Sequence, residues 1–191
     1  MKSVSFKTGC GGSIHLTDSV KEHLEAHSGI LGLIPVIAPR VILPIDGGRL
    51  TCQISLERVV GQSSLIDTQK IGLSETAWFA IRKNRMKASR VVPDAAQVDT
   101  EIVSIVANPV EKNTYELVTA WFGSFAPKEP WDPDLADDPS AYEESINFWC
   151  SHALVHDPAE MDDPFESAWH IILTQSKNLR HLPTTIDGAI R

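Results

Sequence analysis

Two runs of strand-forming residues with a turn between them constrain the fold more than any other feature of this sequence. Residues 101–107 and 114–122 are rich in β-branched and aromatic side chains, and the loop 108–113 between them contains two asparagines and a proline. We therefore predict a β-hairpin. The second run carries apolar side chains on both faces, a pattern typical of a central strand that is covered on each side.

Segments before residue 100 add one helix and two strands. The spacing of Ser19 and Glu22 is that of a capping box, so a helix is expected from about residue 17 to Gly29. Prolines interrupt the apolar segment 30–45, which favours extended segments and turns over a helix. Residues 50–56 alternate between apolar and polar side chains, as a half-buried strand does, and residues 78–83 are also expected to form a strand.

The chain changes character after residue 123. A proline-rich loop at 127–134 contains Trp131 as an aromatic anchor, a second capping-box spacing predicts a helix over 140–155, and Asp163 followed by Pro164 predicts a last helix to about residue 175. This order predicts an α+β fold class, with an N-terminal helix, an antiparallel sheet of about four to six strands and C-terminal helices. Because 191 residues suit one core, we expect a single domain, 1–191, with an acidic, proline-rich loop and helical extension from about 123.

The composition argues for a cytoplasmic protein. The N-terminal residues contain no apolar leader, and no window reaches the roughly 18 apolar residues that a membrane span needs. The three cysteines are odd in number and far apart, so we interpret Cys10, Cys52 and Cys150 as reduced thiols. We expect a soluble protein with no membrane association and no cofactor.

Charge is distributed unevenly in this chain, whose net charge is -8. Five of its 17 Lys and Arg residues form a basic cluster within nine positions: Arg82, Lys83, Arg85, Lys87 and Arg90. Between Glu129 and Glu166 there are twelve carboxylates and no Lys or Arg. The basic cluster either binds an anion such as phosphate, for which the planar fork of Arg is well suited, or pairs with the protein's own carboxylates.

Cleavage of RNA without a metal requires an acid, a base and cations that stabilise charge on the phosphate. His23 and His27 lie one turn apart on the predicted helix and are candidates for the acid and the base, unless they are simply packed helix histidines. Thr119 offers a hydroxyl on the second strand of the hairpin. The predicted phosphate-binding residues are Arg82, Lys83, Ser89 and Arg90.

Three segments carry a resemblance to a known group of enzymes: the helix 17–27, the basic segment 82–90 and the strand 117–121. Together they resemble the barnase, EndoU, colicin and RelE-like ribonuclease toxins, which place helices before a compact antiparallel sheet. The resemblance covers about residues 15–125. It implies a metal-independent ribonuclease acting on RNA, with a catalytic set of His23, His27, Arg85 and Thr119.

Two alternatives remain open at this point. In the first, the protein is a non-enzymatic interaction module whose acidic C-terminal third binds a basic protein partner, and the basic cluster is structural. In the second, His23 with His27 and His152 with His156 each occupy one face of a helix, and the two pairs converge on a metal ion. Whether the protein is an enzyme, and in which oligomeric state it acts, is left undecided by the sequence.

Overall fold

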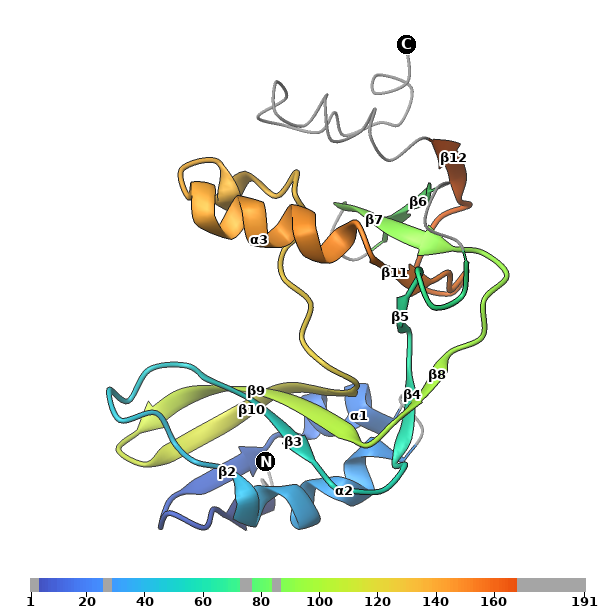
Figure 1. Ribbon diagram of the computed structural model, residues 1–191. Helices are drawn as coiled ribbons and strands as arrows, with labels where there is room; N and C mark the ends of the chain where they lie inside the picture. The colour runs from blue at the N-terminus through green and yellow to red at the C-terminus, as the bar shows by residue number, and fades with distance from the viewer. Residues whose placement is uncertain (1–3, 26–28, 73–76, 84–86, 168–191) are drawn as a thin grey trace. The chain divides into compact units, whose positions relative to one another are not determined.

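The protein is mostly β in the computed structural model, which describes residues 4–25, 29–72, 77–83 and 87–167 (Figure 1). These residues form three α-helices and twelve strands, and the strands are arranged in two five-stranded sheets and one two-stranded sheet. The predicted α+β class, with one antiparallel sheet between N-terminal and C-terminal helices, is therefore wrong. The helices are short and lie between strands in the chain.

The chain divides into two compact units. Unit 1 comprises Met1–Ser63 and Asp99–Phe125, and unit 2 comprises Ser64–Val98 and Ala126–Arg191. Each unit is therefore built from two separate stretches of sequence.

Unit 1 contains a mixed sheet in the order β1-β2-β10-β9-β3. The β2–β10 pair is parallel, and the other neighbours are antiparallel. Two short strands pair separately as β4-β8. The bounds of these strands are β1 Val4–Lys7, β2 Ser13–Leu16, β3 Leu50–Ser55, β4 Gly61–Ser63, β8 Val98–Thr100, β9 Ile102–Glu111 and β10 Thr114–Phe122.

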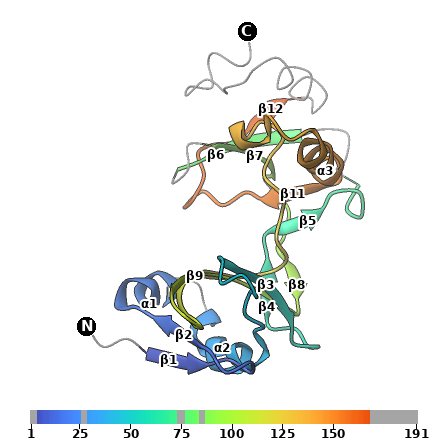
Figure 2. The same cartoon turned by 90° about the vertical axis from the view of Figure 1, so that its left-hand side faces the viewer.

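The β9–β10 hairpin confirms the strongest prediction from the sequence, and β10 lies at the centre of its sheet, in which β1 forms one edge beside β2 (β1 and β2 are labelled in Figure 2). The turn is shorter than predicted, because β9 continues to Glu111 and only two residues connect the strands. Asn113 lies in the left-handed region with φ 59°, which asparagine tolerates well. A shift in register between Thr114 and Tyr115 leaves Val110 without an opposite residue, so Pro109 is accommodated at an irregular position.

Two helices and a 3-10 turn complete unit 1: α1 Asp18–Glu25, α2 Ile30–Ile37 and η1 Ala38–Arg40. The predicted first helix is confirmed as far as Glu25. The prediction of extended segments and turns over 30–45 is wrong for 30–40, where α2 and η1 form around Pro35 and Pro39, and is confirmed for 41–45. Ile30, Ile34 and Ile37 follow helical spacing and are all buried, and this burial outweighs the hydrogen bond that proline cannot donate.

Unit 2 contains a second mixed sheet in the order β12-β6-β7-β11-β5. The β7–β11 pair is parallel, and the other neighbours are antiparallel. The bounds are β5 Leu65–Asp67, β6 Ala77–Arg82, β7 Lys87–Val92, β11 His152–Val155 and β12 Phe165–Ser167. β6 confirms the strand predicted over 78–83, as β3 confirms the strand predicted over 50–56.

The helix of unit 2, α3 Pro139–Trp149, is shorter than the helix predicted over 140–155 (orange in Figure 1). Asp138 caps it by accepting a hydrogen bond from Ala141 N at 3.0 Å. Residues 152–155 form β11 instead, because Ala153 and Val155 alternate inward with period two. The prediction of a helix from Asp163 is also wrong where it begins, because β12 forms there. The remaining residues of the predicted helix lie outside the described part of the chain.

The loop predicted over 127–134 is confirmed, with a 3-10 turn, η2 Pro133–Leu135, at its end. Trp131 anchors it: the ring is buried, packs edge-on against Phe79 and donates from Nε1 to Ala88 O at 2.8 Å. Among the described residues, no helix is both long enough and apolar enough to cross a membrane.

Candidate functional site

Arg82 and Ser89, two of the predicted phosphate-binding residues, lie on the neighbouring strands β6 and β7. Arg82 Nε donates to Ser89 Oγ at 2.7 Å, and both side chains contact one carboxylate oxygen, Oε1 of Glu129. Ser89 donates to that oxygen at 2.7 Å, and Arg82 Nη2 forms an ion pair with it. The Glu129 side chain is 9% exposed, so the pair is largely shielded from water.

Arg90 is almost completely buried, with 1% of its surface exposed. Its Nη1 donates to three oxygens, Thr68 Oγ1 at 3.0 Å, Trp149 O at 3.2 Å and His152 O at 2.9 Å. One guanidinium thereby connects β7 to the end of α3, to the start of β11 and to the residue after β5. Burial lowers the pKa of Arg90 because the charged form loses its water.

Lys83, another member of the basic cluster, is exposed. Its Nζ donates to Pro158 O at 2.7 Å, and its backbone N donates to Glu160 O at 3.0 Å. The side chain of Arg82 is one quarter exposed, and Arg90 is buried. These two arginines of the basic cluster therefore bind groups inside unit 2.

The predicted catalytic and phosphate-binding residues are divided between the two units. His23 is exposed on α1, and Thr119 is half-buried on β10, both in unit 1, whereas Arg82 and Arg90 belong to unit 2. His27 and Arg85 lie outside the described residues. A pocket of about 330 Å³ lies beside the tip of the β9–β10 hairpin, and neither His23 nor Thr119 lines it.

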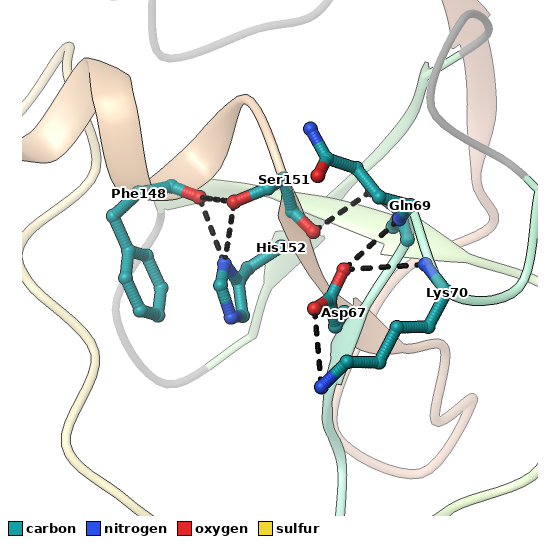
Figure 3. Close-up of polar contacts among 7 residues, drawn as sticks. Asp67, Gln69, Lys70, Phe148, Ser151 and His152 are labelled. Atoms are coloured by element: carbon teal, nitrogen blue, oxygen red, sulfur yellow. Dashed lines mark hydrogen bonds and ion pairs between the residues drawn. The ribbon is translucent and has the colours of Figure 1, made fainter.

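The structure reveals a polar corner in unit 2 that the sequence did not indicate (Figure 3). His152 stacks on Phe148 with ring centroids 4.1 Å apart, and its Nδ1 lies 3.0 Å from Phe148 O and 2.9 Å from Ser151 Oγ. Because a carbonyl only accepts, Nδ1 carries the hydrogen in the neutral ring and Nε2 is the basic nitrogen. The corner forms where the chain turns from helix to strand, between Trp149 at the end of α3 and His152 at the start of β11.

Asp67 lies opposite His152 on β5. Its carboxylate accepts from the backbone N of Gln69 at 3.1 Å and of Lys70 at 3.3 Å, and lies 3.5 Å from Lys70 Nζ (Figure 3). Desolvation raises the pKa of Asp67, but the contacts with Lys70 and Gln69 together outweigh it and lower the pKa. These contacts close a turn after β5.

His152 and His156 do not share a helical face, so the arrangement predicted for the metal alternative is wrong for this pair. His156 lies just after β11 and places Nε2 2.9 Å from Asp162 O. Within the described part of the chain, no three His, Cys, Asp or Glu side chains are grouped closely enough to hold a metal ion.

The acidic residues of unit 2 are mostly exposed, in contrast to Arg82 and Arg90. Of the twelve carboxylates between Glu129 and Glu166, only Glu129 and Asp132 are buried and Asp157 is half-buried. Five exposed carboxylates lie close together in sequence around the start of α3, and we call them the acidic surface: Asp134, Asp137, Asp138, Glu143 and Glu144.

Comparisons with known proteins assign no family to this chain. No family model and no curated protein sequence matches it. A crystal structure of a conserved hypothetical protein from Toxoplasma gondii ME49 is similar over 72% of this chain and 85% of that chain, with 11% sequence identity and a TM-score of 0.47.

Proposed function

We propose that unit 2 is a protein-interaction module whose acidic surface binds a basic segment of a partner protein. The observation that carries this proposal is the exposure of most carboxylates in a unit whose two described arginines are engaged internally. Arg82 and Arg90 bind groups inside the unit, whereas nine of the twelve carboxylates between Glu129 and Glu166 face solvent. A protein surface with this excess of one sign attracts segments of the other sign.

Three members of the acidic surface have no ion-pair partner among the described residues: Asp137, Glu143 and Glu144. Asp134 is paired with Lys128, and Asp138 caps α3. The contact with Asp134 raises the pKa of Lys128, as expected for a cation beside a carboxylate. A Lys-rich or Arg-rich segment of a partner would therefore find three carboxylates that fold stability does not use.

The metal-independent ribonuclease stays a prediction. A phosphate approaching Arg82 and Ser89 would have to displace Glu129, and one approaching Arg90 would have to displace backbone carbonyls. We also propose a cytoplasmic location. The structure describes all three cysteines, and none of them forms a disulfide.

The test is titration of the full chain into a fluorescein-labelled oligolysine peptide, followed by fluorescence anisotropy. We expect binding that weakens as salt is raised. Neutralising two carboxylates in the Glu143→Gln/Glu144→Gln variant should weaken binding about fivefold at low salt, since exposed ion pairs contribute about 0.2 to 1 kcal/mol each.

The matched control is Glu22→Gln/Glu116→Gln, which removes the same charge from exposed positions of unit 1. Equal weakening by both pairs of substitutions would show a general charge effect and contradict the proposal. A second experiment tests the ribonuclease prediction by incubating the chain with labelled single-stranded RNA in the presence of a chelator. RNA cleavage by the wild type that is lost in Arg82→Ala would support the ribonuclease instead of the interaction module.

A further inference from the structure

The pocket beside the tip of the β9–β10 hairpin lies between two turns of unit 1 that backbone hydrogen bonds hold in place. One wall is the turn 44–47, which Gly47 N closes by donating to Pro44 O at 3.2 Å. The other wall is the hairpin tip, where Asn113 O accepts from Ser13 N at 2.9 Å. The volume of about 330 Å³ lies near the lower end of the range of small-molecule sites, and the fixed walls make the pocket preformed.

Tyr115 lines this pocket and gives the clearest indication of a ligand. The residue is 2% exposed, and its hydroxyl forms no hydrogen bond with another described residue. The hydroxyl oxygen is not sealed inside the core, so it is the part of this buried side chain that opens into the pocket. Buried tyrosine hydroxyls usually bind a partner, and a phenol oxygen both donates and accepts. A ligand in the pocket would therefore meet an available hydrogen-bonding group.

Apolar side chains lie on both walls of the pocket and are unusually exposed. Ile45 is fully exposed on one wall, and Val110 is 62% exposed on the other. Pro44 and Pro109 add rigid apolar surface beside them. A single exposed aliphatic side chain is common, but exposed aliphatic groups on both sides of one pocket are typical of a ligand site. The body of the ligand should therefore be apolar.

The charged residues of the pocket favour a positively charged ligand. Two acids, Asp46 and Glu111, line the pocket with a single cation, Lys112. Asp46 Oδ1 accepts from Gly48 N at 2.9 Å, and none of the three charged side chains forms an ion pair with another described residue. The two carboxylates outweigh the one ammonium, and the whole chain carries a net charge of -8, so the local potential attracts cations.

We propose that this pocket binds a small organic ammonium compound with an apolar body. The apolar body lies between Ile45 and Val110, and the ammonium lies near Asp46 and Glu111. The Tyr115 hydroxyl oxygen accepts a hydrogen bond from the ammonium. The site belongs to unit 1 and contains no residue of the acidic surface, so it is independent of the interaction proposed for unit 2.

The experiment is a titration of the full chain with phenethylamine, followed by chemical-shift changes in proton–nitrogen correlation NMR spectra. Phenethyl alcohol and hydrocinnamate are the matched probes, because they carry the same ring on a neutral and an anionic chain. We expect saturable shifts with the amine and a dissociation constant at least about fivefold higher for the two matched probes. The absence of saturable shifts with the amine, or equal or tighter binding of hydrocinnamate, would overturn the proposal.

Variants then locate the binding site. Tyr115→Phe removes only the hydroxyl, and Glu111→Gln removes one exposed charge; each should raise the dissociation constant of phenethylamine by about threefold to fivefold. Lys112→Gln should lower it. Glu22→Gln makes the same charge change as Glu111→Gln at an exposed position on α1 and should leave it unchanged. Equal weakening by Glu22→Gln, or no weakening by Glu111→Gln, would contradict the assignment even if Tyr115→Phe did not fold.

Discussion

The two units of this protein have interiors of different chemistry. Unit 1 has one continuous apolar core that is almost entirely aliphatic, with Tyr115 as its one fully buried aromatic ring among the described residues. Unit 2 has three smaller apolar clusters. The described buried polar side chains of unit 1 are all hydroxyls, namely Thr8, Ser13, Ser63 and Ser104, whereas those of unit 2 include charged groups: Thr68, Ser89, Arg90, Glu129, Asp132 and Ser145.

This difference indicates that the two units depend on different forces. Burial of apolar area is non-directional and tolerates small shifts, so the core of unit 1 should be robust to changes in charge. Buried polar groups require partners at defined distances, and removing one partner leaves the others unsatisfied. Unit 2 should therefore be more sensitive to a single polar substitution than unit 1 is.

The largest effect is expected from Arg90→Met, which keeps an apolar stem of similar length and removes the guanidinium. Thr68, Trp149 and His152 then lose the donor that satisfies their buried oxygens. We expect a loss of about 4 kcal/mol in the free energy of unfolding, because three acceptors are left unsatisfied at about 1 to 3 kcal/mol each. Hydrogen exchange followed by mass spectrometry should locate the loss of protection in unit 2.

The same measurement tests the prediction of a single domain, 1–191. Loss of protection in both units together would support one cooperative domain, whereas loss confined to unit 2 would support two. The matched control is Arg49→Met at an exposed position in unit 1, which should change the free energy of unfolding by no more than about 0.5 kcal/mol.

In unit 1, a comparable loss of stability requires shortening a buried apolar side chain. Ile105 is 1% exposed at the centre of β9, and Ile105→Ala should cost about 3 kcal/mol through lost burial and a residual cavity. Urea denaturation gives the magnitude, and hydrogen exchange should show the effect in unit 1. A loss below about 1 kcal/mol would contradict the apolar account of this core.

Glu129→Gln provides an intermediate test of unit 2, because it preserves size while removing the charge that Arg82 and Ser89 share. The Arg82 guanidinium then lacks its carboxylate in a site that is partly shielded from water. We expect a loss of about 1 to 2 kcal/mol in urea denaturation. Glu116→Gln, an exposed position on β10, should have almost no effect, and equal effects would show that Glu129 is not a structural partner.

The smallest effect concerns Cys52, whose thiol lies on the half-buried side of β3. Burial raises the pKa of Cys52 from 9.0 to about 11, so the unfolded chain loses this proton at lower pH than the folded chain. The contribution of Cys52 to stability should be constant below pH 9.0 and decrease as pH rises toward about 11. Urea denaturation at pH 8 and pH 10 measures it, and Cys52→Ala should lack this part of the pH dependence.

Alkylation with iodoacetamide tests the same site by reactivity. Cys10 is exposed, and its pKa is lowered chiefly by a hydrogen bond with Thr8. Since the thiolate is the reactive form, Cys10 should be modified well before Cys52 in the folded protein. Faster modification of Cys52 would show that the core of unit 1 opens readily.

Local patterns in the sequence predicted the elements that depend on local interactions. The hairpin, β3 and β6 follow from alternation and turn residues, and α1 follows from its cap. α2 was not predicted because the prolines at 35, 39 and 44 argue against a helix, although its three buried isoleucines have helical spacing. β11 was missed because residues 152–155 fit a helix or a strand equally well until β5 and β7 lie on either side.

The candidate site was less predictable than the fold. Glu129 is 47 positions from Arg82, and nothing in their spacing indicates that they meet. The donors and acceptors around Arg90 include backbone carbonyls, which exist at every residue and so give no signal in sequence. The sequence shows that acidic and basic residues are concentrated in different segments. Only the three-dimensional structure shows that Arg82 and Arg90 bind groups within the protein.

The order of strands in unit 1 has a consequence for its synthesis. The middle strand of its sheet, β10, is also the last one that a ribosome delivers, after the intervening residues of unit 2 have emerged. β1, β2 and β3 must therefore wait, with apolar faces uncovered, until residue 122 has left the exit tunnel. Truncation before that point would yield a chain without a sheet centre, which makes such fragments candidates for chaperone capture.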